Sequence, residues 1–299
     1  MKYNYNGIEI ELRDKTCMLN NEEPGDMLPQ TNLYIRVCND CNADCKFCEY
    51  HGKFCDFDIS RLDEALQDLQ SRNIVGKIQI TGGEPTLHPY RLITVVDIIR
   101  KYFPDRFIGI NSNGFNLGVL IEIKDRIDNI AISRHHYDDD INREIFNSIT
   151  IPDTNQLKGL IDKVGSDKIH FSCNLMKNYL GNLDEIKKYL EFCSSIGCND
   201  IGFVTLMDVN KFAKSERVIF DNIGFENDPE FLKYKQFVKD KNACRCANYI
   251  YHCKNTNKLI DIYGRFVMCT ENKDGLISFD GLNLRDGFNG SLISVGEGI

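Results

Sequence analysis

Three cysteines near residue 40 have a spacing suited to holding one metal centre. Cys41, Cys45 and Cys48 form the pattern C-x3-C-x2-C, and Cys38 lies three residues before it. A four-iron cubane takes one thiolate on each iron, so three ligands would leave one iron open for chemistry. The spacing alone also fits a structural zinc site completed by Cys38 or by His51.

A second group of cysteines lies near the C-terminus. Its members are Cys244, Cys246, Cys253 and Cys269. The chain has 13 cysteines, an odd number in a sequence long enough to fold without disulfides, which favours metal ligation over a disulfide framework. Cys253 and Cys269 flank Gly264, so we predict that they lie on either side of a β-hairpin that turns at Gly264-Arg265. A structural zinc ion held by the four thiolates is the alternative.

A glycine pair follows a short apolar run as Thr81-Gly82-Gly83-Glu84-Pro85. Paired glycines at the end of a strand permit backbone conformations and close approaches that other residues resist. Their amides and carbonyls could hold a charged amino-acid group. Taken alone, the segment also fits an ordinary turn between a strand and a helix.

Further polar residues follow the other candidate strands, where a parallel sheet has its active site. Those after the third and fourth candidate strands are Asn113, Ser133, Arg134, His135, His136 and Tyr137. Along the fifth, His170, Ser172 and Asn174 alternate, so they share one face. These groups could bind or protonate a substrate, and each also fits a capped turn or a satisfied polar group.

Short apolar runs and amphipathic helical patterns alternate from residue 33 to about residue 206. The candidate strands are Leu33–Val37, Lys77–Thr81, Phe107–Asn111, Asn129–Ser133, Lys168–Cys173 and Ile201–Leu206. Their length and their β-branched and aromatic residues suit buried parallel strands. Six βα units predict an α/β fold, either a full or partial barrel or a doubly wound sheet.

Capping residues and apolar spacing predict helices between these strands. Ser60, with Asp63 three residues later, begins one helix, and Asn182 with Glu185 begins another. Beyond residue 210 the βα alternation stops. We therefore predict an N-terminal extension over residues 1–30, an α/β domain over 31–229 and a small domain with a β-hairpin over 230–299.

Composition excludes several classes of protein. The formal charge is −8, and no basic run is present, which argues against binding of duplex nucleic acid. No apolar stretch is long enough to span a membrane, and the N-terminus lacks the apolar core of a signal peptide. We therefore expect a cytoplasmic protein.

Taken together, C-x3-C-x2-C after the first strand and Gly-Gly-Glu-Pro after the second resemble the radical S-adenosylmethionine (radical SAM) superfamily. The resemblance implies a (β/α)6 partial TIM barrel and a [4Fe–4S] cluster on Cys41, Cys45 and Cys48. The open iron would chelate the amino and carboxylate groups of SAM. One electron would cleave SAM to a 5′-deoxyadenosyl radical, which abstracts hydrogen from the substrate.

The same resemblance implies roles for other residues. Asn42 matches the family pattern, Phe47 would pack near the adenine, and Gly82, Gly83, Glu84 and Pro85 would hold the SAM amino group. Further SAM contacts are assigned to Asn113, Ser133 and Asn174. Contacts to the substrate, or catalytic roles, are assigned to Arg134, His135, His136, Tyr137 and His170.

The C-terminal cysteines resemble the twitch and SPASM domains that carry auxiliary clusters in this superfamily. The resemblance implies a second [4Fe–4S] cluster on Cys253, Cys269 and one or both of Cys244 and Cys246. No cysteine follows Cys269, which favours the smaller twitch domain. The Cys-x-Cys spacing departs from the Cys-x-x-Cys of the cyclic pyranopterin synthase group, so the full ligand set is open.

Three functions fit these features. The first is a radical SAM enzyme for a small molecule, such as a nucleoside, nucleotide or modified base, with a layout similar to cyclic pyranopterin synthase or queuine lyase and with a flavodoxin- or ferredoxin-type electron donor. The second is a maturase that crosslinks or epimerises ribosomally made peptides. The third is a non-enzymatic zinc or iron–sulfur protein. The outcome after hydrogen abstraction, as in a lyase or a cyclase, is not encoded in any motif.

Overall fold

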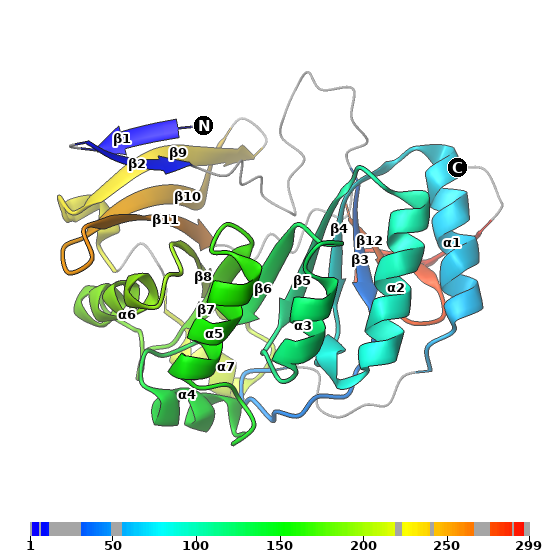
Figure 1. The fold of residues 1–299 in the computed structure, drawn as a ribbon, viewed down its shortest axis with the longest axis horizontal. Helices are drawn as coiled ribbons and strands as arrows, with labels where there is room; N and C mark the ends of the chain where they lie inside the picture. The colour runs from blue at the N-terminus through cyan, green and yellow to red at the C-terminus, as the bar shows by residue number, and fades with distance from the viewer. Residues whose placement is uncertain are drawn as a thin grey trace. The chain divides into compact units, whose positions relative to one another are not determined.

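The fold is described from a computed structural model of the chain (Figure 1). The residues that the structure describes are 2–5, 7–11, 31–48, 56–218, 223–239, 242–265, 276–288 and 290–295. Parallel strands alternate with helices through most of this range. The prediction of an α/β fold is therefore confirmed.

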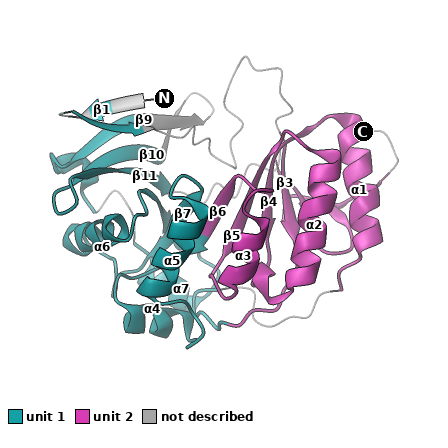
Figure 2. Ribbon diagram, viewed as in Figure 1, with its two compact units in different colours: residues 1–17, 43–49, 132–268 teal, residues 18–42, 50–131, 269–299 magenta. Residues whose placement is uncertain are grey.

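The chain divides into two compact units (Figure 2). Unit 1 comprises Met1–Cys17, Ala43–Glu49 and Ile132–Met268. Unit 2 comprises Met18–Asn42, Tyr50–Ala131 and Cys269–Ile299. The chain passes from unit 2 to unit 1 within the cysteine motif and again within strand β6 (Asn129–Ser133).

The strands of unit 2 are ordered β14-β13-β12-β3-β4-β5. Their bounds are β3 (Thr31–Arg36), β4 (Val75–Thr81), β5 (Phe107–Ser112), β12 (Leu276–Phe279), β13 (Leu284–Asp286) and β14 (Leu292–Ile293). The pairs β12–β3, β3–β4 and β4–β5 are parallel, and the pairs that include β13 are antiparallel. The first three candidate strands of the sequence correspond to β3, β4 and β5.

The helices of unit 2 bury the apolar faces that their sequences predict. They are α1 (Ile59–Arg72), α2 (Pro89–Tyr102) and α3 (Leu117–Ile123), with the short 3-10 helix η1 (Pro85–Leu87). One prediction is wrong by two residues, because α1 is capped by Asp58 and not by Ser60. The Asp58 carboxylate accepts hydrogen bonds from the amides of Ser60 and Arg61, while Asp63 bonds instead to Lys101.

The strands of unit 1 are ordered β7-β8-β11-β10-β9. Their bounds are β7 (Ile169–Leu175), β8 (Asp200–Thr205), β9 (Phe231–Lys239), β10 (Asn242–Cys253) and β11 (Lys258–Arg265). β11 pairs in parallel with β8, so the C-terminal strands extend the same sheet. The predicted domain boundaries near residues 30 and 229 remain predictions.

The helices of unit 1 alternate with the strands β6, β7 and β8 along the chain. They are α4 (Asp139–Phe146), α5 (Thr154–Val164), α6 (Leu183–Ser195), α7 (Lys211–Glu216) and the 3-10 helix η3 (Phe225–Asn227). The predicted start of α6 is confirmed, since the Asn182 side chain accepts a hydrogen bond from the amide of Glu185. The apolar face of α6 buries Ile186, Tyr189 and Leu190.

The C-terminal hairpin is present, but the predicted turn at Gly264-Arg265 is wrong. β10 and β11 form the hairpin, and its turn covers residues 254–257. Gly264 lies inside β11, opposite Ala247. The polar sequence Lys-Asn-Thr-Asn after Cys253 makes the turn, and Asn257 adopts a left-handed conformation with a φ of 53°.

An N-terminal hairpin also joins unit 1. Its strands are β1 (Lys2–Tyr5) and β2 (Ile8–Glu11), which no sequence pattern predicted. Ile8 and Ile10 pack against Ile250 and Leu259 of the β10–β11 hairpin. Among the described residues, no helix has the length and apolar character needed to cross a membrane.

Candidate active site

The glycine pair of unit 2 packs against the backbone that leads into Cys41. The amide of Gly83 donates to the carbonyl of Cys38 at 2.8 Å, and the amide of Glu84 donates to the carbonyl of Asp40 at 2.9 Å. A Cβ atom at Gly83 would lie 2.1 Å from the Asp40 carbonyl oxygen, and one at Gly82 would lie 2.5 Å from that of Cys38. Only glycine permits this approach.

The Glu84 carboxylate joins the loops that follow β4 and β5. It is 1% exposed and accepts hydrogen bonds from the Thr86 amide at 3.0 Å and hydroxyl at 2.6 Å, from the Ser112 hydroxyl at 2.7 Å and from the Asn113 amide at 2.6 Å. Burial raises the pKa of Glu84, and these four donors oppose that effect. The carboxylate therefore fixes the position of Asn113.

Asn113 in turn contacts the cysteine motif. Its side-chain nitrogen donates to Asn42 Oδ1 at 2.8 Å and lies 3.7 Å from Cys41 Sγ. Its side-chain oxygen accepts from the amide of Phe115 at 3.0 Å. Unit 2 thus brings together Cys41, Asn42, Asn113 and the glycine segment, all of which the sequence singled out.

The other two cysteines of the motif lie on one turn of unit 1. The amide of Cys48 donates to the carbonyl of Cys45 at 2.9 Å. The amide of Asp44 donates to the carbonyl of Phe146, the last residue of α4, at 3.0 Å. Cys45 is 9% exposed and packs against Phe146, while Cys48 is half-buried. The end of α4 therefore supports this turn.

Aromatic packing holds His135 beside the same turn. Its ring stacks on Phe146 with centroids 4.8 Å apart, and Phe47 meets it edge-on at 5.3 Å. Burial, with a smaller effect of the Arg134 charge, lowers the pKa of His135 to about 3. The backbone amide of Asn174 donates to His135 Nδ1 at 3.1 Å, so the neutral ring carries its proton on Nε2.

Arg134 and Tyr137 make internal contacts. The Arg134 guanidinium is 1% exposed, pairs with Asp139 at 2.6 Å and lies over the ring of Phe192. Burial alone would raise the pKa of Asp139, but the hydrogen bond and the charge of Arg134 help to hold it below its usual value. Tyr137 donates to Glu185 at 2.7 Å, which raises the Tyr137 pKa. Both side chains join elements of unit 1.

Asn142 is a buried residue of this region that sequence patterns missed. Its side-chain oxygen accepts from the amides of His135 at 2.8 Å and of His136 at 3.2 Å, so it shapes the loop after β6. His136 Nδ1 accepts from the amide of Asp138 at 3.0 Å, and burial lowers the pKa of His136. No local spacing marks Asn142, because its partners lie in the preceding loop.

The alternation predicted along β7 is present. His170, Ser172 and Asn174 are half-buried, whereas the residues between them are buried. His170 Nδ1 lies 2.9 Å from Asp200 Oδ1 on the neighbouring strand β8. Ser133 ends β6 and is also half-buried.

The second cysteine group is spread along a strand. Cys246 and Cys253 are both wholly buried in β10, and the strand pairs with β11 without interruption from Ala247 to Cys253. At about 3.3 Å per residue, their Cα atoms are about 23 Å apart. The side chain of Cys244, and the whole of Cys269, lie outside the described residues.

This separation corrects any ligand set that contains both Cys246 and Cys253, because one cubane cannot bridge two residues about 23 Å apart along a strand. Cys253 Sγ lies 2.8 Å from a carboxylate oxygen of Glu191 on α6. Burial and this hydrogen bond raise the pKa of the Cys253 thiol. The described residues therefore do not fit an auxiliary cluster held by all four cysteines.

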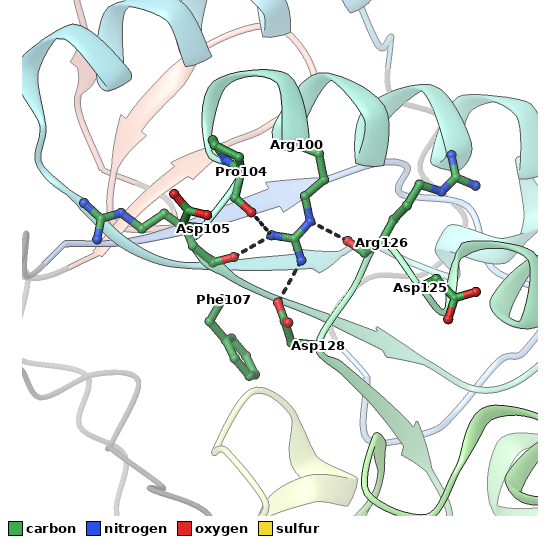
Figure 3. Close-up of a pocket in the computed structure, with 8 residues that line it drawn as sticks. Arg100, Pro104, Asp105, Phe107, Asp125, Arg126 and Asp128 are labelled. Atoms are coloured by element: carbon green, nitrogen blue, oxygen red, sulfur yellow. Dashed lines mark hydrogen bonds and ion pairs between the residues drawn. The ribbon is translucent and has the colours of Figure 1, made fainter.

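A surface cavity of unit 2 lies at the opposite, amino-terminal edge of β5 (Figure 3). Arg100 fills it and donates to the carbonyls of Pro104, Arg106 and Arg126 and to the carboxylate of Asp128. These bonds join the loops before β5 and β6. Arg100 is therefore a structural staple between these loops. A structural role is expected at this edge of a βα fold, because the active site lies at the opposite edge.

The donor set of the first motif fits an iron–sulfur cluster. Among the cysteines that the structure describes, none is in a disulfide. Cys41 and Cys48 are half-buried, and Cys41, Cys45 and Cys48 all lie outside regular strands and helices. Thiolates are the ligands that such clusters take, and irregular chain does not hold three of them in the fixed spacing of a strand or helix.

Comparisons with known proteins agree with this donor set. A family model described as the radical SAM superfamily matches residues 35–193. A probable GTP 3′,8-cyclase of Saccharolobus islandicus is 28% identical over 190 residues, which are 60% of this chain and 58% of that protein. One of Thermoplasma volcanium is 34% identical over 116 residues, 38% of this chain and 35% of that protein. The alignments thus span less than two thirds of these relatives.

Among solved structures, SuiB of Streptococcus suis bound to S-adenosylmethionine superposes with a TM-score of 0.52 at 17% identity. The match covers 64% of this chain and 44% of SuiB. At this identity the likeness concerns the fold alone, and it confirms the partial TIM barrel class predicted from the sequence.

Proposed function

Because the family model matches more than half of its length, the chain belongs to the radical SAM superfamily, and from this premise we propose that it removes hydrogen from a nucleoside, a nucleotide or a modified base. That the protein is an enzyme that uses a [4Fe–4S] cluster and SAM follows from the family. The substrate class is the proposal. The chain's own contacts support the assignment of its residues to the cofactors.

We assign the cluster to Cys41, Cys45 and Cys48. When bound, the cluster supplies the electron that cleaves SAM to the 5′-deoxyadenosyl radical. Each unit supports its own part of the motif. In unit 2, Asn113 bonds to Asn42 beside Cys41, and in unit 1, Phe146 supports Cys45.

The contacts of Glu84 are the observation that carries the cofactor assignment. Its buried carboxylate uses four donors to join Thr86, Ser112 and Asn113, and Asn113 then reaches the cysteine motif. A network internal to unit 2 therefore fixes the loops after β3, β4 and β5. Such fixed loops suit a reaction whose reactive species must be kept from water.

The glycine segment is suited to a cationic group. The amides of Gly83 and Glu84 are already bonded to the carbonyls of Cys38 and Asp40. The Glu84 carbonyl already accepts the amide of Leu87 at 3.1 Å, but no hydrogen bond of the described residues uses the carbonyl oxygens of Gly82 and Gly83. These two oxygens can receive the donors of an ammonium group, which offers three. This arrangement supports contact between Gly82–Pro85 and the amino group of SAM.

Unit 1 contributes a neutral imidazole. With a pKa near 3, His135 stays uncharged at neutral pH. It accepts the Asn174 amide and packs between Phe47 and Phe146, so we assign it the positioning of Asn174 and Phe47. We keep Ser133 as a SAM contact because it ends β6, where the active site of this fold lies. The substrate contact of His170 stays a prediction, since His170 is the second residue of β7 and bonds to Asp200 at the start of β8.

The proposal of a nucleotide-like substrate is supported by the relatives named GTP 3′,8-cyclase. Their alignments cover 58% or less of each relative, so GTP is a first probe and not an assigned substrate. Another structure of SuiB holds the precursor peptide SuiA, but at 17% identity the likeness concerns the fold and does not favour a peptide substrate here. We also propose a flavodoxin- or ferredoxin-type electron donor.

The test is an anoxic assay of the reconstituted full-length chain. We expect dithionite and SAM to yield 5′-deoxyadenosine, and addition of GTP or other nucleotides to increase its amount and yield a new product by mass spectrometry. The variant with Cys41, Cys45 and Cys48 all changed to Ala should yield none, whereas Cys198→Ala is the matched control. Cleavage of SAM that no nucleotide or nucleoside stimulates would contradict the substrate class.

A non-enzymatic protein and a peptide maturase give different results in the same assay. A zinc or iron–sulfur protein without activity yields no 5′-deoxyadenosine at any iron content. A maturase yields it in greater amount with a precursor peptide than with any nucleotide.

A further inference from the structure

Cys38, Asp40 and His88 form a second cluster of metal-ligand side chains in unit 2. Their ligand atoms all lie within 4.8 Å of one another, and Asp40 Oδ2 is 2.7 Å from His88 Nε2. The function proposed above uses none of these three side chains. We propose that unit 2 binds one zinc ion through Cys38 Sγ, an Asp40 carboxylate oxygen and His88 Nε2.

The spacing of the three atoms suits this ion. Tetrahedral zinc with bonds of about 2.3 Å to sulfur and about 2.0–2.1 Å to nitrogen and oxygen separates its ligand atoms by about 3.3–3.6 Å. The three ligand atoms lie within 4.8 Å of one another, a limit that includes these separations. The contact between Asp40 and His88, now 2.7 Å, would widen by about 0.6 Å to admit the ion.

The backbone holds two of the ligands in place. The close approach of Gly82 and Gly83 fixes Cys38 and Asp40 through the two backbone hydrogen bonds described above. Cys38 is wholly buried, and its Sγ lies 3.5 Å from the carbonyl oxygen of Asp40.

The third ligand stands at the junction of two helices. The amide of His88 donates to the carbonyl of Pro85 at 3.3 Å, which closes η1, and His88 is the first residue before α2. Its imidazole is 33% exposed and the Asp40 carboxylate 41% exposed. The open side could admit the ion and would leave a fourth position for water.

The types of ligand favour zinc over the ions that compete with it. One thiolate, one imidazole and one carboxylate form a mixed set that suits borderline-soft Zn²⁺, whereas Mg²⁺ and Ca²⁺ take oxygen ligands. In the structure, Cys38 Sγ lies 3.3 Å from the carbonyl oxygen of Glu84, as a thiol donor would. Zinc would replace that thiol proton as the thiolate forms.

A zinc ion at this site would restrain the position of Cys41, the residue that follows Asp40 in the chain. Asp40 directly precedes Cys41, and His88 directly precedes α2. A zinc ion between them would tie the first cysteine of the motif to a helix of 14 residues. We therefore assign the site a structural role in unit 2.

The experiment measures zinc on the full-length chain, purified anoxically, reconstituted with iron and sulfide and then exposed to zinc chloride and dialysed. We expect about one zinc ion per chain, and a zinc K-edge spectrum with one sulfur neighbour at about 2.3 Å and nitrogen or oxygen neighbours at about 2.0 Å. Cys38→Ala and His88→Ala should each lose the zinc. The matched controls, Cys198→Ala and His252→Ala in unit 1, should keep it.

Two results would overturn the proposal. One is zinc that stays substoichiometric in the wild-type chain, or is retained by both Cys38→Ala and His88→Ala. The other is a spectrum with three or more sulfur neighbours, which would place zinc in the C-x3-C-x2-C motif. Neither readout depends on cleavage of SAM, so failure of the enzyme assay and failure of this proposal are distinguishable.

Discussion

Both cysteine groups of this chain were predicted from the sequence to hold a cluster, but the described parts of the two groups differ in structure. Cys41, Cys45 and Cys48 lie in irregular chain between β3 and α1, whereas Cys246 and Cys253 lie seven residues apart on one strand. Irregular chain can fold back on itself, but a strand separates its residues by about 3.3 Å each. The same number of intervening residues therefore allows ligands to come together in irregular chain but keeps them apart in a strand.

The largest effect should come from the loop cysteines. Cys45→Ala removes one of three ligands, so we expect loss of about four irons per chain and of all 5′-deoxyadenosine formation. Iron and sulfide analysis with the anoxic assay measures both. Full activity in Cys45→Ala would show that the motif does not hold the cluster.

A smaller loss should follow when the support of the loop is weakened. Glu84→Gln keeps the size of the side chain but replaces an acceptor oxygen with an NH₂ donor facing Thr86, Ser112 or Asn113. By analogy with partners that orient metal ligands, we expect a decrease of about 10–100-fold in 5′-deoxyadenosine formation. Asp58→Ala, which removes a helix cap in the same unit, is the matched control.

If Glu84→Gln retained the wild-type rate and iron content, the network would be dispensable for the site. A melting temperature measured on both variants separates this effect from general destabilisation.

The strand cysteines give the direct test of the comparison. In a chain whose Cys41, Cys45 and Cys48 are Ala, any remaining iron belongs to an auxiliary cluster. We expect that no more than one of Cys246→Ala and Cys253→Ala lowers that iron, because the two residues are too far apart to share a core. Loss of about four irons in both variants, with unchanged circular dichroism, would contradict the extended strand.

The aromatic support of Cys45 and Cys48 predicts a dependence on pH. The pKa of His135 falls from 6.5 to about 3 in the folded chain, so below pH 6.5 the unfolded chain binds a proton that the folded chain does not. The free energy of unfolding should therefore decrease as pH falls from 6.5 towards 3, by up to about 1.4 kcal/mol per pH unit.

Urea unfolding at several pH values measures that slope. His135→Gln, whose amide oxygen can still accept from Asn174 and does not titrate, should have a shallower slope. Equal slopes in the two chains would show that folding does not shift the pKa of His135.

The smallest effect should come from the staple of Figure 3, which lies apart from either cysteine group in sequence. Arg100→Lys loses part of the hydrogen bonding to the loops before β5 and β6. We expect a decrease of about 1–3 kcal/mol in the free energy of unfolding and no change in 5′-deoxyadenosine formed per iron. A change in that ratio would connect this edge to the site.

Local rules recovered most of the fold because strands and helix faces are written in periodic patterns. The face of α1 with Leu62 and Leu66 and the cap at Asn182 follow from such rules. The cap of α1 was misplaced because Asp58 and Ser60 are both competent caps two residues apart. The hairpin turn was misplaced because glycine is a common turn residue. Gly264 instead pairs with Phe203 of the neighbouring strand β8, so β11 continues through it.

The site was predicted less completely, for a different reason. Motif spacing identified Asn42, Asn113 and Glu84, whose contacts run between adjacent strand ends. It could not identify Asn142, Glu191 or the pairing of Asp40 with His88, because these contacts join residues whose proximity depends on tertiary packing. Expectations for Ser133, His170 and the substrate contacts remain predictions.

The close approach at Gly82 and Gly83 has a consequence for directed evolution. A saturation library at these two codons should return almost only the parental pair after selection, since even the methyl group of alanine meets a backbone oxygen at 2.5 Å or less. Useful diversity for altering the reaction would have to be introduced elsewhere, at half-buried positions such as Ser172 of β7.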